Sequence, residues 1–310
     1  MLAIINPEAG RRAGLRTWRR LRTKAAAITR DWECVTTRYA GHATALARAA
    51  ATTRRYDRVV VLGGDGTVSE VASGLADSET PLCIIPVGTG NDIARNLAIP
   101  RHPIAAARLA ASGSPRAIDL GRVETFATSR SVTYFVNVAG LGFDAEAAWR
   151  VKRLPRLVGG TLPYLVGTLQ TLWQYAAPRV RVSLDAQVIV LPLFMAAIGN
   201  CAAYAGGMRI VPTARPDDGI FDVCLVHALP RLEVLRMIPR LYSGGHVSHP
   251  AVRLIRCRTL AAEVLSASDR GPDRVFCHAD GERVGPLPAR FTIRPDALRC
   301  VTGRLPGSAS

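Results

Sequence analysis

The sequence predicts an α/β domain built on a parallel sheet, followed by a β-sandwich domain. Up to about residue 120, short runs of branched apolar residues alternate with helical segments, including Ala-rich ones near residues 42–53 and 103–112. Parallel sheets covered by helices on both faces have this pattern. Beyond that point, short apolar segments are separated by Pro, Gly and Asp turns, which is typical of an all-β domain. A length of 310 residues is enough for two domains.

The first expected strand covers residues 2–5 and ends in a glycine turn that carries two arginines. The turn reads Asn6-Pro7-Glu8-Ala9-Gly10-Arg11-Arg12. Arginine side chains can bind phosphate oxygens through two parallel hydrogen bonds. We therefore interpret this turn as a candidate phosphate-binding turn.

The second expected strand, residues 58–62, opens directly into Gly63-Gly64-Asp65-Gly66-Thr67. Glycines let the backbone approach a ligand without a Cβ in the way. Thr67 and Glu70 have the spacing of a capping box, which predicts that a helix begins there, and the free amides of a helix N-terminus favour an anion. Asp65 would repel a phosphate unless a divalent cation lies between them. The turn indicates a nucleotide with Mg²⁺, and an ordinary strand-to-helix turn is the alternative.

A third strand, turn and helix follow at residues 81–97. The turn Val87-Gly88-Thr89-Gly90-Asn91-Asp92 again places a threonine three residues before an acid, which predicts a second capping box. The carboxyl ends of neighbouring parallel strands meet at one edge of the sheet, and open α/β sheets bind ligands there. We therefore expect Asp65 and Asp92 to lie close together at a phosphate-binding edge.

The second domain is expected to contain several short strands. They are predicted over residues 132–138, 180–184, 188–197, 220–226 and 290–293. Two uncharged stretches, residues 157–178 and 187–208, are long enough to span a bilayer, but Pro and Gly interrupt both. We interpret the second stretch as buried strands and a loop.

The first uncharged stretch carries a helical stripe beside a basic cluster. The stripe comprises Leu162, Leu165, Val166, Leu169, Leu172 and Trp173, and the cluster comprises Arg150, Lys152, Arg153 and Arg156. A plain core helix explains the stripe. The alternative is an interfacial helix that helps to admit a lipid, since apolar bulk, Trp and flanking cations favour an interface.

The net charge is +16, and Lys24 and Lys152 are the only lysines among 40 basic residues. Neither lysine lies in a Walker A loop or in a strand like that of protein kinases, which excludes both of those nucleotide-binding designs. Residues 9–30 contain eight basic residues and no acid, with apolar residues at helical spacing. Such a cationic face suits an anionic membrane surface. The alternatives are a solvated outer helix of the α/β domain and, in part, a contact to nucleotide phosphate.

The cysteines point to a reducing compartment, and the histidines give no sign of a zinc site. The seven cysteines include no C-x-x-C pair, which favours free thiols in the cytoplasm. The six histidines lack the spacing of a zinc site. Because the chain starts directly with an expected strand, we expect no export signal.

Taken together, the motifs resemble a known family, the bacterial diacylglycerol kinase-like lipid kinases, whose relatives include sphingosine and ceramide kinases. The matching segments are NPEAGRR at 6–12, GGDGTVSEV at 63–71, IIPVGTGNDIARNL at 84–97, AIDLGRV at 117–123, FVNVAGLGFDA at 135–145, VPTARPDDGIFDV at 211–223 and HADGERV at 278–284. GGDGT alone is shared with NAD kinases and phosphofructokinases. The resemblance implies a nucleotide-binding α/β domain of that type over residues 1–122, a β-sandwich over residues 123–294, and a return of residues 295–310 to the first domain.

The resemblance also implies ATP, Mg²⁺ and a set of site residues. The nucleotide-binding positions would be Asn6, Pro7, Glu8, Ala9, Gly10, Arg11, Thr37, Gly64, Asp65, Gly66, Thr67, Val68, Ser69, Glu70, Thr89 and Asp92. Asp65, Asp92 and Asp119 would form a Mg²⁺-linked acidic network with Asp65 acting in catalysis, and Arg11 stands where relatives often carry lysine. The turn Asp280-Gly281-Glu282 would supply the catalytic base, either Glu282 or Asp280. Its pKa would have to be raised by burial or by neighbouring acids.

A separate loop before the expected strand at residues 220–226 resembles the structural Mg²⁺ site of this family. The matching positions are Asp218, through its carboxylate, and Arg215 and Ile220, through their backbone carbonyls. Oxygen ligands of this kind suit a hard cation. A normal Asp-Gly turn is the alternative.

The expected activity is therefore ATP- and Mg²⁺-dependent phosphorylation of the hydroxyl of a membrane lipid. Diacylglycerol ranks first as substrate, with ceramide or a sphingoid base second and NAD as the nearest competing acceptor. The charge alone would also fit a nucleic-acid-binding protein, but helix-turn-helix, zinc-finger and RNP patterns are absent from the sequence. We expect a cytoplasmic enzyme that associates peripherally with an anionic membrane surface and binds no nucleic acid. The sequence leaves the oligomeric state open between a monomer and a homodimer.

Overall fold

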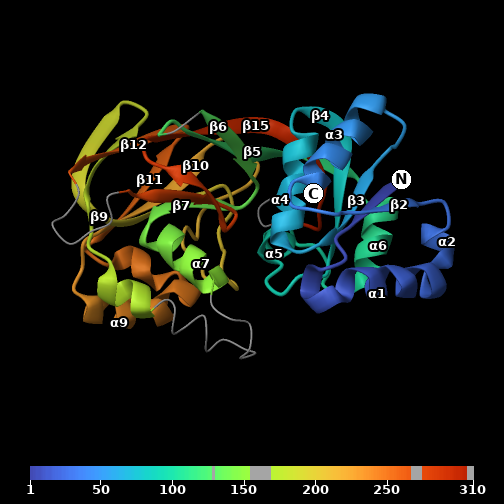
Figure 1. Ribbon diagram of the computed structural model, residues 1–310, viewed down its shortest axis with the longest axis horizontal. Coiled ribbons are helices and arrows are strands. Elements are labelled where there is room, and N and C mark those ends of the chain that lie inside the picture. The colour runs from blue at the N-terminus through green and yellow to red at the C-terminus, as the bar shows by residue number, and fades with distance from the viewer. Residues whose placement is uncertain (128–129, 154–168, 267–273, 306–310) are drawn as a thin grey trace.

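The computed structural model describes residues 1–127, 130–153, 169–266 and 274–305. Figure 1 shows two lobes, with the N-terminal part of the chain on the right and the β-rich part on the left. The long strand β15 (Ala289–Val301) runs between them. It pairs with β12 (Thr259–Ser266) in the left lobe and with β4 (Ser78–Pro86) in the right lobe, so one continuous strand joins the two domains.

The right lobe is the predicted parallel α/β domain. Its strands run in the order β4, β3 (Val59–Gly63), β1 (Leu2–Ile5) and β2 (Glu33–Thr36), all parallel. Every residue of β1 and β3 is buried, which explains the uninterrupted apolar runs of their sequences.

Helices cover both faces of this sheet. Contacts join α1 (Ala9–Lys24), α2 (Ala26–Thr29) and α6 (Pro103–Ser112) on one face, and α3 (His42–Thr53) packs on α4 (Asp65–Leu75) on the other (Figure 1). The short helix α5 (Asp92–Asn96) follows β4. The two Ala-rich helices predicted from the sequence are confirmed as α3 and α6.

The left lobe is a two-layered β structure, as predicted. Its further strands are β5 (Pro115–Thr125), β6 (Ser131–Phe135), β7 (Val138–Gly142), β8 (Arg179–Leu184), β9 (Gln187–Gly199), β10 (Phe221–His227), β11 (Val252–Cys257), β13 (Phe276–Ala279) and β14 (Glu282–Pro286). The long strand β9 pairs with β8 in one layer and with β7 and β10 in the other. Apolar side chains such as Phe135, Phe221 and Phe291 fill the space between the layers.

Two expectations about this lobe need correction. The predicted strand over residues 132–138 is interrupted, because β6 ends at Phe135 and β7 begins at Val138. The domain is also not all-β, since it contains the helices α7 (Phe143–Arg153) and α9 (Arg231–Ser243). Both pack over an apolar cluster on the outer side of the β7–β9–β10 layer. Interrupted apolar spacing and Pro239 within α9 obscure its helical pattern in the sequence.

The last part of β15 packs with the first domain. Ala297, Leu298 and Val301 belong to the apolar core of the α/β domain, and the register of β15 against β5 shifts between Arg294 and Leu298. Residues 306–310 of the predicted returning segment lie outside the described residues. In the described part of the chain, the helices are too short or too polar to cross a membrane.

Candidate active site

The three predicted turns meet at the carboxyl edge of the parallel sheet. The Asn6 backbone N–H donates to the Leu62 carbonyl over 3.0 Å, and the Val87 N–H donates to the Gly63 carbonyl over 3.0 Å. The Asn6 side-chain amide donates to Thr67 Oγ1 over 2.8 Å. The turns that follow β1, β3 and β4 are therefore held together by hydrogen bonds, as the sequence predicted.

Glycine is required where these turns touch one another. A Cβ on Gly88 would lie 2.5 Å from the Cα atom of Gly64, and a Cβ on Gly10 would overlap the Val87 carbonyl oxygen. Gly10 also has a positive φ of 58°, a conformation that other residues adopt at a cost. The glycines thus bring the three backbones into contact.

Both predicted capping boxes are wrong in detail. Helix α4 begins at Asp65, two residues before Thr67, and no side chain caps it. Thr67 instead accepts the Asn6 bond, while the Glu70 carboxylate accepts a hydrogen bond from the Ala43 N–H over 3.2 Å. The threonine and the glutamate are thus both committed to tertiary contacts.

Helix α5 likewise starts at Asp92 without a cap from Thr89. Its preceding turn is closed by Asn91, whose Oδ1 accepts from the Gly88 N–H over 2.9 Å and whose Nδ2 donates to the Gly88 carbonyl over 2.8 Å. The backbone amides at the start of α4 still lie at the edge where the turns meet, so the anion-binding argument for that helix holds.

The structure brings Asp65 and Asp92 together at this edge. Their Oδ2 atoms lie 3.1 Å and 3.5 Å from the place that a Cβ on Gly90 would occupy. Asp65 Oδ1 accepts from the Ile93 N–H over 2.9 Å, and Asp92 Oδ2 accepts from the Gly206 N–H over 2.8 Å. Arg95 forms an ion pair with Asp92.

Burial raises the pKa of Asp65, backbone donors such as Ile93 N–H oppose the shift, and the nearby charge of Asp92 adds to it. Because the negative charge of Asp65 is disfavoured by burial and by Asp92, a cation bound beside the two carboxylates would stabilise their charged forms. The described residues contain no cluster of three or more acidic, His or Cys side chains that could hold a metal. Mg²⁺ commonly needs only one or two carboxylates, with waters and phosphate oxygens completing its shell. Asp92 already pairs with Arg95, so Asp65 is the carboxylate of the two that fits that ion better.

Asp119, the third acid of the predicted network, lies in a different group of contacts. Its carboxylate accepts hydrogen bonds from the Gly219 N–H over 2.7 Å and from the Asp296 N–H over 2.9 Å. Burial raises its pKa, and these two donors oppose the shift. The structure therefore groups Asp119 with the loop at residues 215–220 and with β15, and none of its hydrogen bonds joins it to Asp65 or Asp92.

The loop predicted to hold a structural Mg²⁺ is occupied by an ion pair. Arg256 from β11 pairs with the Asp218 carboxylate and also lies 3.6 Å from Asp222 Oδ2. Burial raises the pKa of Asp218, and the Arg256 charge lowers it. Arg215 forms its own pair with Asp217 over 3.2 Å. Because a guanidinium already neutralises Asp218, these residues fit a metal ion poorly.

The two candidate bases occupy different environments. The Asp280 carboxylate accepts four hydrogen bonds, from Ser69 Oγ (2.6 Å), Val136 N–H (2.9 Å), Asn137 N–H (2.9 Å) and Val138 N–H (3.1 Å). Burial raises its pKa, and these donors oppose the shift. Asp280 thereby ties α4 of the first domain to the chain between β6 and β7. Glu282 is exposed, and its Oε1 atom lies 3.5 Å from the position of a Cβ on Gly66, at the head of α4.

The remaining predicted nucleotide-binding residues lie around the same edge. Thr37 follows β2, and its N–H donates to the Ile5 carbonyl over 2.9 Å. The Glu8 N–H donates to Asn6 Oδ1 over 3.0 Å, and its carboxylate pairs with Arg12 over 3.3 Å. Arg11 is exposed, and it follows Gly10 in the left-handed region with φ of 57°, so the regular turns of α1 begin after these residues.

Sequence reasoning missed polar residues that join α5 to the second domain. The Asn96 side-chain amide donates to Asn137 Oδ1 over 2.7 Å and to the Ala203 carbonyl over 2.6 Å. Gly206 belongs to the same loop and holds Asp92. Short motifs at residues 96 and 137 contain these asparagines, but only the fold shows that they meet.

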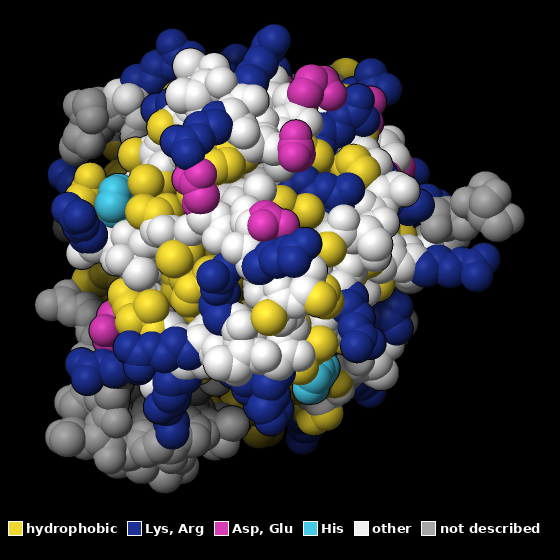
Figure 2. Space-filling model, turned by 90° about the vertical axis from the view of Figure 1, so that its right-hand side faces the viewer, with side chains coloured by type: hydrophobic (Ala, Val, Ile, Leu, Met, Phe, Trp, Pro, Cys, Tyr) yellow, Lys and Arg dark blue, Asp and Glu magenta, His cyan; other side chains and the backbone are white. Residues whose placement is uncertain are grey.

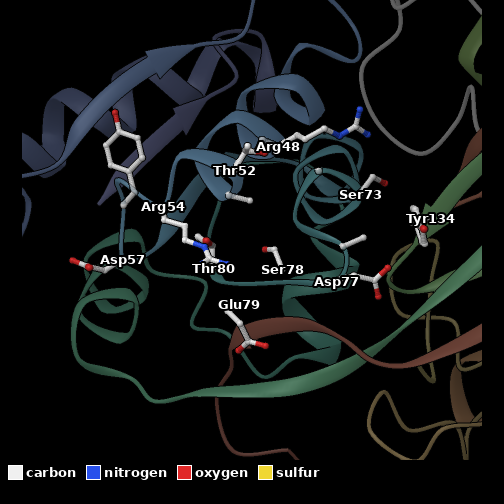
Figure 3. A pocket seen from close by; sticks show the side chains of 14 residues that line it. Arg48, Thr52, Arg54, Asp57, Ser73, Asp77, Ser78, Glu79, Thr80 and Tyr134 are labelled. Atoms are coloured by element: carbon white, nitrogen blue, oxygen red, sulfur yellow. The ribbon is translucent and has the colours of Figure 1, made fainter.

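A cavity of the first domain lies away from this edge. It has a volume of about 770 Å³ and is lined by residues such as Arg48, Arg54, Asp77 and Tyr134 (Figure 3). The C-terminal ends of α3 and α4 border it, and helix C-termini carry partial negative charge. The cavity is therefore poorly suited to the phosphates that the glycine turns would bind.

The fold and this edge together define a class of protein: a two-domain protein whose α/β domain gathers glycine turns and acids at one sheet edge, and whose β-sandwich domain carries an acidic turn to that edge. Residues 1–123 match the family described as "Diacylglycerol kinase catalytic domain", and residues 137–302 match "YegS C-terminal NAD kinase beta sandwich-like domain".

Curated relatives agree with these matches. The chain is 35% identical over 258 residues to a diacylglycerol kinase of Mycobacterium tuberculosis (strain ATCC 25618 / H37Rv), covering 83% of this chain and 80% of that protein. It is 29% identical to a diacylglycerol kinase of Bacillus subtilis (strain 168), covering 93% and 91% of the two chains. The chain belongs to the diacylglycerol kinase-like lipid kinase family, and it is an enzyme of the lipid kinase class.

The fold is also that of a solved structure. The crystal structure of a diacylglycerol kinase from Bacillus anthracis str. Sterne superposes with a TM-score of 0.71 at 22% identity, covering 97% of this chain and 96% of that one. This likeness extends over both domains.

Proposed function

We propose that the protein transfers the γ-phosphate of ATP to the hydroxyl of a membrane lipid in a Mg²⁺-dependent reaction. Diacylglycerol is the first-ranked acceptor, because the similar curated proteins carry that name, and ceramide or a sphingoid base is the second. The observation that carries the proposal is the position of Glu282. An exposed carboxylate from the second domain reaches the glycine turn at the head of α4, where phosphates would bind.

The first domain would hold the nucleotide. The backbone amides at the start of α4 and the glycine turns offer donors to phosphate oxygens, and Asn6 and Thr67 fix the spacing of those turns. Asp65 would hold Mg²⁺ beside the phosphates, with Asp92 next to it, and the ion when bound would supply positive charge that stabilises the transferring group.

The second domain would supply the base. Phosphoryl transfer to an alcohol requires a group that takes the hydroxyl proton. Asp280 is a poor candidate, because both of its oxygens already accept two hydrogen bonds each. Glu282 is exposed beside Gly66, so a lipid hydroxyl approaching from the solvent side can reach its carboxylate. We therefore assign Glu282 as the base and Asp280 as the residue that fixes the turn.

Labelled ATP offered with diacylglycerol, ceramide, sphingosine and NAD in parallel tests this proposal. We expect label in diacylglycerol most strongly, loss of labelling without Mg²⁺, and loss of labelling in Glu282→Gln. Labelled NAD with unlabelled lipids would replace the lipid kinase assignment by an NAD kinase one.

We further propose that α1 docks the enzyme peripherally on an anionic membrane from the cytoplasmic side. Figure 2 shows Lys and Arg side chains dominating the lower half of the face formed by the first domain. Arg16, Arg19 and Arg20 of α1 are exposed, while Trp18 and Leu21 are buried in the domain core. The apolar side of α1 is therefore used for folding, and docking would be electrostatic, at about 1 kcal/mol per basic residue near the surface.

The second basic cluster contributes less to this proposal. Arg150 is engaged by Glu146 and Gln174. The Lys152 and Arg153 side chains, Arg156, and Leu162, Leu165 and Val166 of the apolar stripe lie outside the described residues. Within the described part of the stripe, Leu172 is buried and Trp173 is exposed beside Arg231.

A further inference from the structure

A buried histidine and aspartate lie directly behind the turn that carries Glu282. His278 of β13 is 2% exposed and Asp144 of α7 is 8% exposed. Their side chains meet with His278 Nε2 2.9 Å from Asp144 Oδ2. Neither residue belongs to the nucleotide-binding edge, and the phosphoryl transfer described above does not use them.

The hydrogen bonds on both sides of the imidazole assign its tautomer. The Gly281 N–H donates to His278 Nδ1 over 3.3 Å, so Nδ1 acts as an acceptor. The proton therefore resides on Nε2, which donates to Asp144. Asp144 is itself fixed at the start of α7, because its Oδ1 accepts from the Ala145 N–H over 2.8 Å. A chain of oriented contacts thus runs from α7 through Asp144 and His278 to the backbone of the turn.

The surrounding structure leaves room only for this arrangement. A Cβ on Gly140 of β7 would lie 2.6 Å from His278 Nε2 and would overlap Asp144 Oδ2 still more closely. The Tyr204 ring stacks on the imidazole, with centroids 6.3 Å apart. Gly140 therefore makes space for the pair, and the Tyr204 ring lies nearly parallel to the imidazole.

We propose that Asp144 and His278 are positioning residues that hold the Asp280–Glu282 turn so that the Glu282 carboxylate faces Gly66. Two side chains hold the turn in addition to its backbone bonds: Asp280 accepts from the amides of Val136, Asn137 and Val138, and His278 accepts from the Gly281 N–H. Asp280 and Gly281 both have positive φ values, 48° and 80°, as in the two-residue hairpin turns that Asp-Gly favours, and the pairing of Ala279 with Glu282 closes the turn. The side-chain contacts therefore set where the hairpin tip lies against α4 rather than its local shape. This inference rests on the proposed role of Glu282.

Loss of the His278 tie should therefore lower kcat and spare substrate binding. A displacement of a catalytic group by about 1 Å can cost about 100-fold in rate. Among the described residues, the nucleotide turns and the start of α4 make no hydrogen bond to His278 or Asp144. KM for ATP should therefore stay within about twofold of the wild-type value.

Three substitutions of His278 separate positioning from folding. His278→Asn keeps an acceptor oxygen close to the place of Nδ1, whereas His278→Gln keeps a donor toward Asp144 and loses that acceptor. His278→Leu loses both. We expect His278→Gln and His278→Leu to lower kcat by about 10- to 100-fold with ATP KM unchanged, and His278→Asn to recover most of the activity.

Gly140→Ala provides a test that removes no polar atom. Its methyl group would push Asp144 and His278 apart, so we expect the same fall in kcat as in His278→Leu. Gly245→Ala is the matched control in the same domain, because a Cβ there would lie 3.3 Å from the Ser243 hydroxyl and far from the pair. It should keep wild-type kcat.

Melting temperatures and kinetics of all five variants are measured with labelled ATP and lipid vesicles. If wild-type protein labels no lipid, the proposed function is refuted, and the positioning role of His278 and Asp144 is refuted with it. If wild-type protein is active, two outcomes overturn the positioning role: wild-type kcat in His278→Leu and Gly140→Ala, or losses of kcat in all three His278 variants that simply follow their losses in melting temperature.

Discussion

The Asp280 carboxylate joins the two domains, and its replacement by asparagine is expected to destabilise the protein measurably. Each carboxylate oxygen accepts two hydrogen bonds: Oδ1 from Asn137 and Val138, and Oδ2 from Ser69 and Val136. An asparagine keeps one oxygen. Its NH₂ group can donate to the Ser69 hydroxyl, but it cannot accept from the Val136 N–H, which becomes a buried donor without a partner.

An unsatisfied buried donor costs about 1–3 kcal/mol. Asp280→Asn should therefore lower the free energy of unfolding by about that amount. For chains of about 150–250 residues, each kcal/mol lowers the melting temperature by about 2–4 °C, so we expect a shift of that order or slightly less here. Ser69→Ala removes only the hydroxyl bond between the domains and leaves the three backbone bonds in place. It should cost less, about 0.5–1.5 kcal/mol.

Denaturant unfolding of wild type, Asp280→Asn and Ser69→Ala measures these differences, with lipid phosphorylation followed in parallel. We expect the order of stability wild type, Ser69→Ala, Asp280→Asn. The reasoning is refuted if Asp280→Asn is as stable as wild type, or if Ser69→Ala is the more damaging of the two.

Three further predictions concern charge. Asp65→Asn should abolish turnover and leave the fold intact. In wild type, burial raises the pKa of Asp65, so the folded state binds the proton of this carboxyl group more tightly than the unfolded state does. The contribution of Asp65 to the free energy of unfolding therefore falls as the pH rises from 3.8, the ordinary pKa, through the raised pKa. Melting temperatures against pH for wild type and Asp65→Asn check that difference, and parallel curves would count against it. Asp218→Ala should lower the melting temperature because it removes one of the two carboxylates that Arg256 contacts and leaves only the longer contact with Asp222. A chelator should not lower it; a drop on chelation would restore the structural metal predicted from the sequence. Charge reversal of three exposed arginines should weaken binding to anionic vesicles at low salt. Wild-type binding should weaken as the Debye length falls from about 8 Å at physiological salt to about 3 Å at 1 M salt, while activity on a short-chain soluble lipid is preserved in both cases. Vesicle binding that changes with neither treatment would rule out docking through α1. The three arginines are Arg16, Arg19 and Arg20.

The strands and glycine turns of the first domain could be predicted because their signals are local. Each turn directly follows a fully buried apolar strand such as β1 or β3, and parallel strands end at one edge. The meeting of Asp65 with Asp92 follows from these two facts alone. The capping boxes failed because Thr67 and Glu70 bond to Asn6 and Ala43, residues distant in sequence whose positions only the fold determines.

The second domain was less predictable for the same reason. The break between β6 and β7 occurs where three consecutive amides bind Asp280, more than 140 residues along the chain. The pairing of Asp218 with Arg256 and of Asp144 with His278 also joins distant segments. Side chains in such pairs look like ordinary turn or strand residues in the sequence, so their partners cannot be deduced from spacing.

The central claim is that Glu282 removes the lipid proton at the phosphate-binding edge. Its most direct test is the initial rate of label transfer from ATP to diacylglycerol by wild type and by Glu282→Gln, at saturating ATP and Mg²⁺. Because a positioned general base contributes about 10²- to 10⁴-fold, we predict a fall in kcat of that size with unchanged ATP KM and unchanged melting temperature. Wild-type kcat in Glu282→Gln would contradict the account.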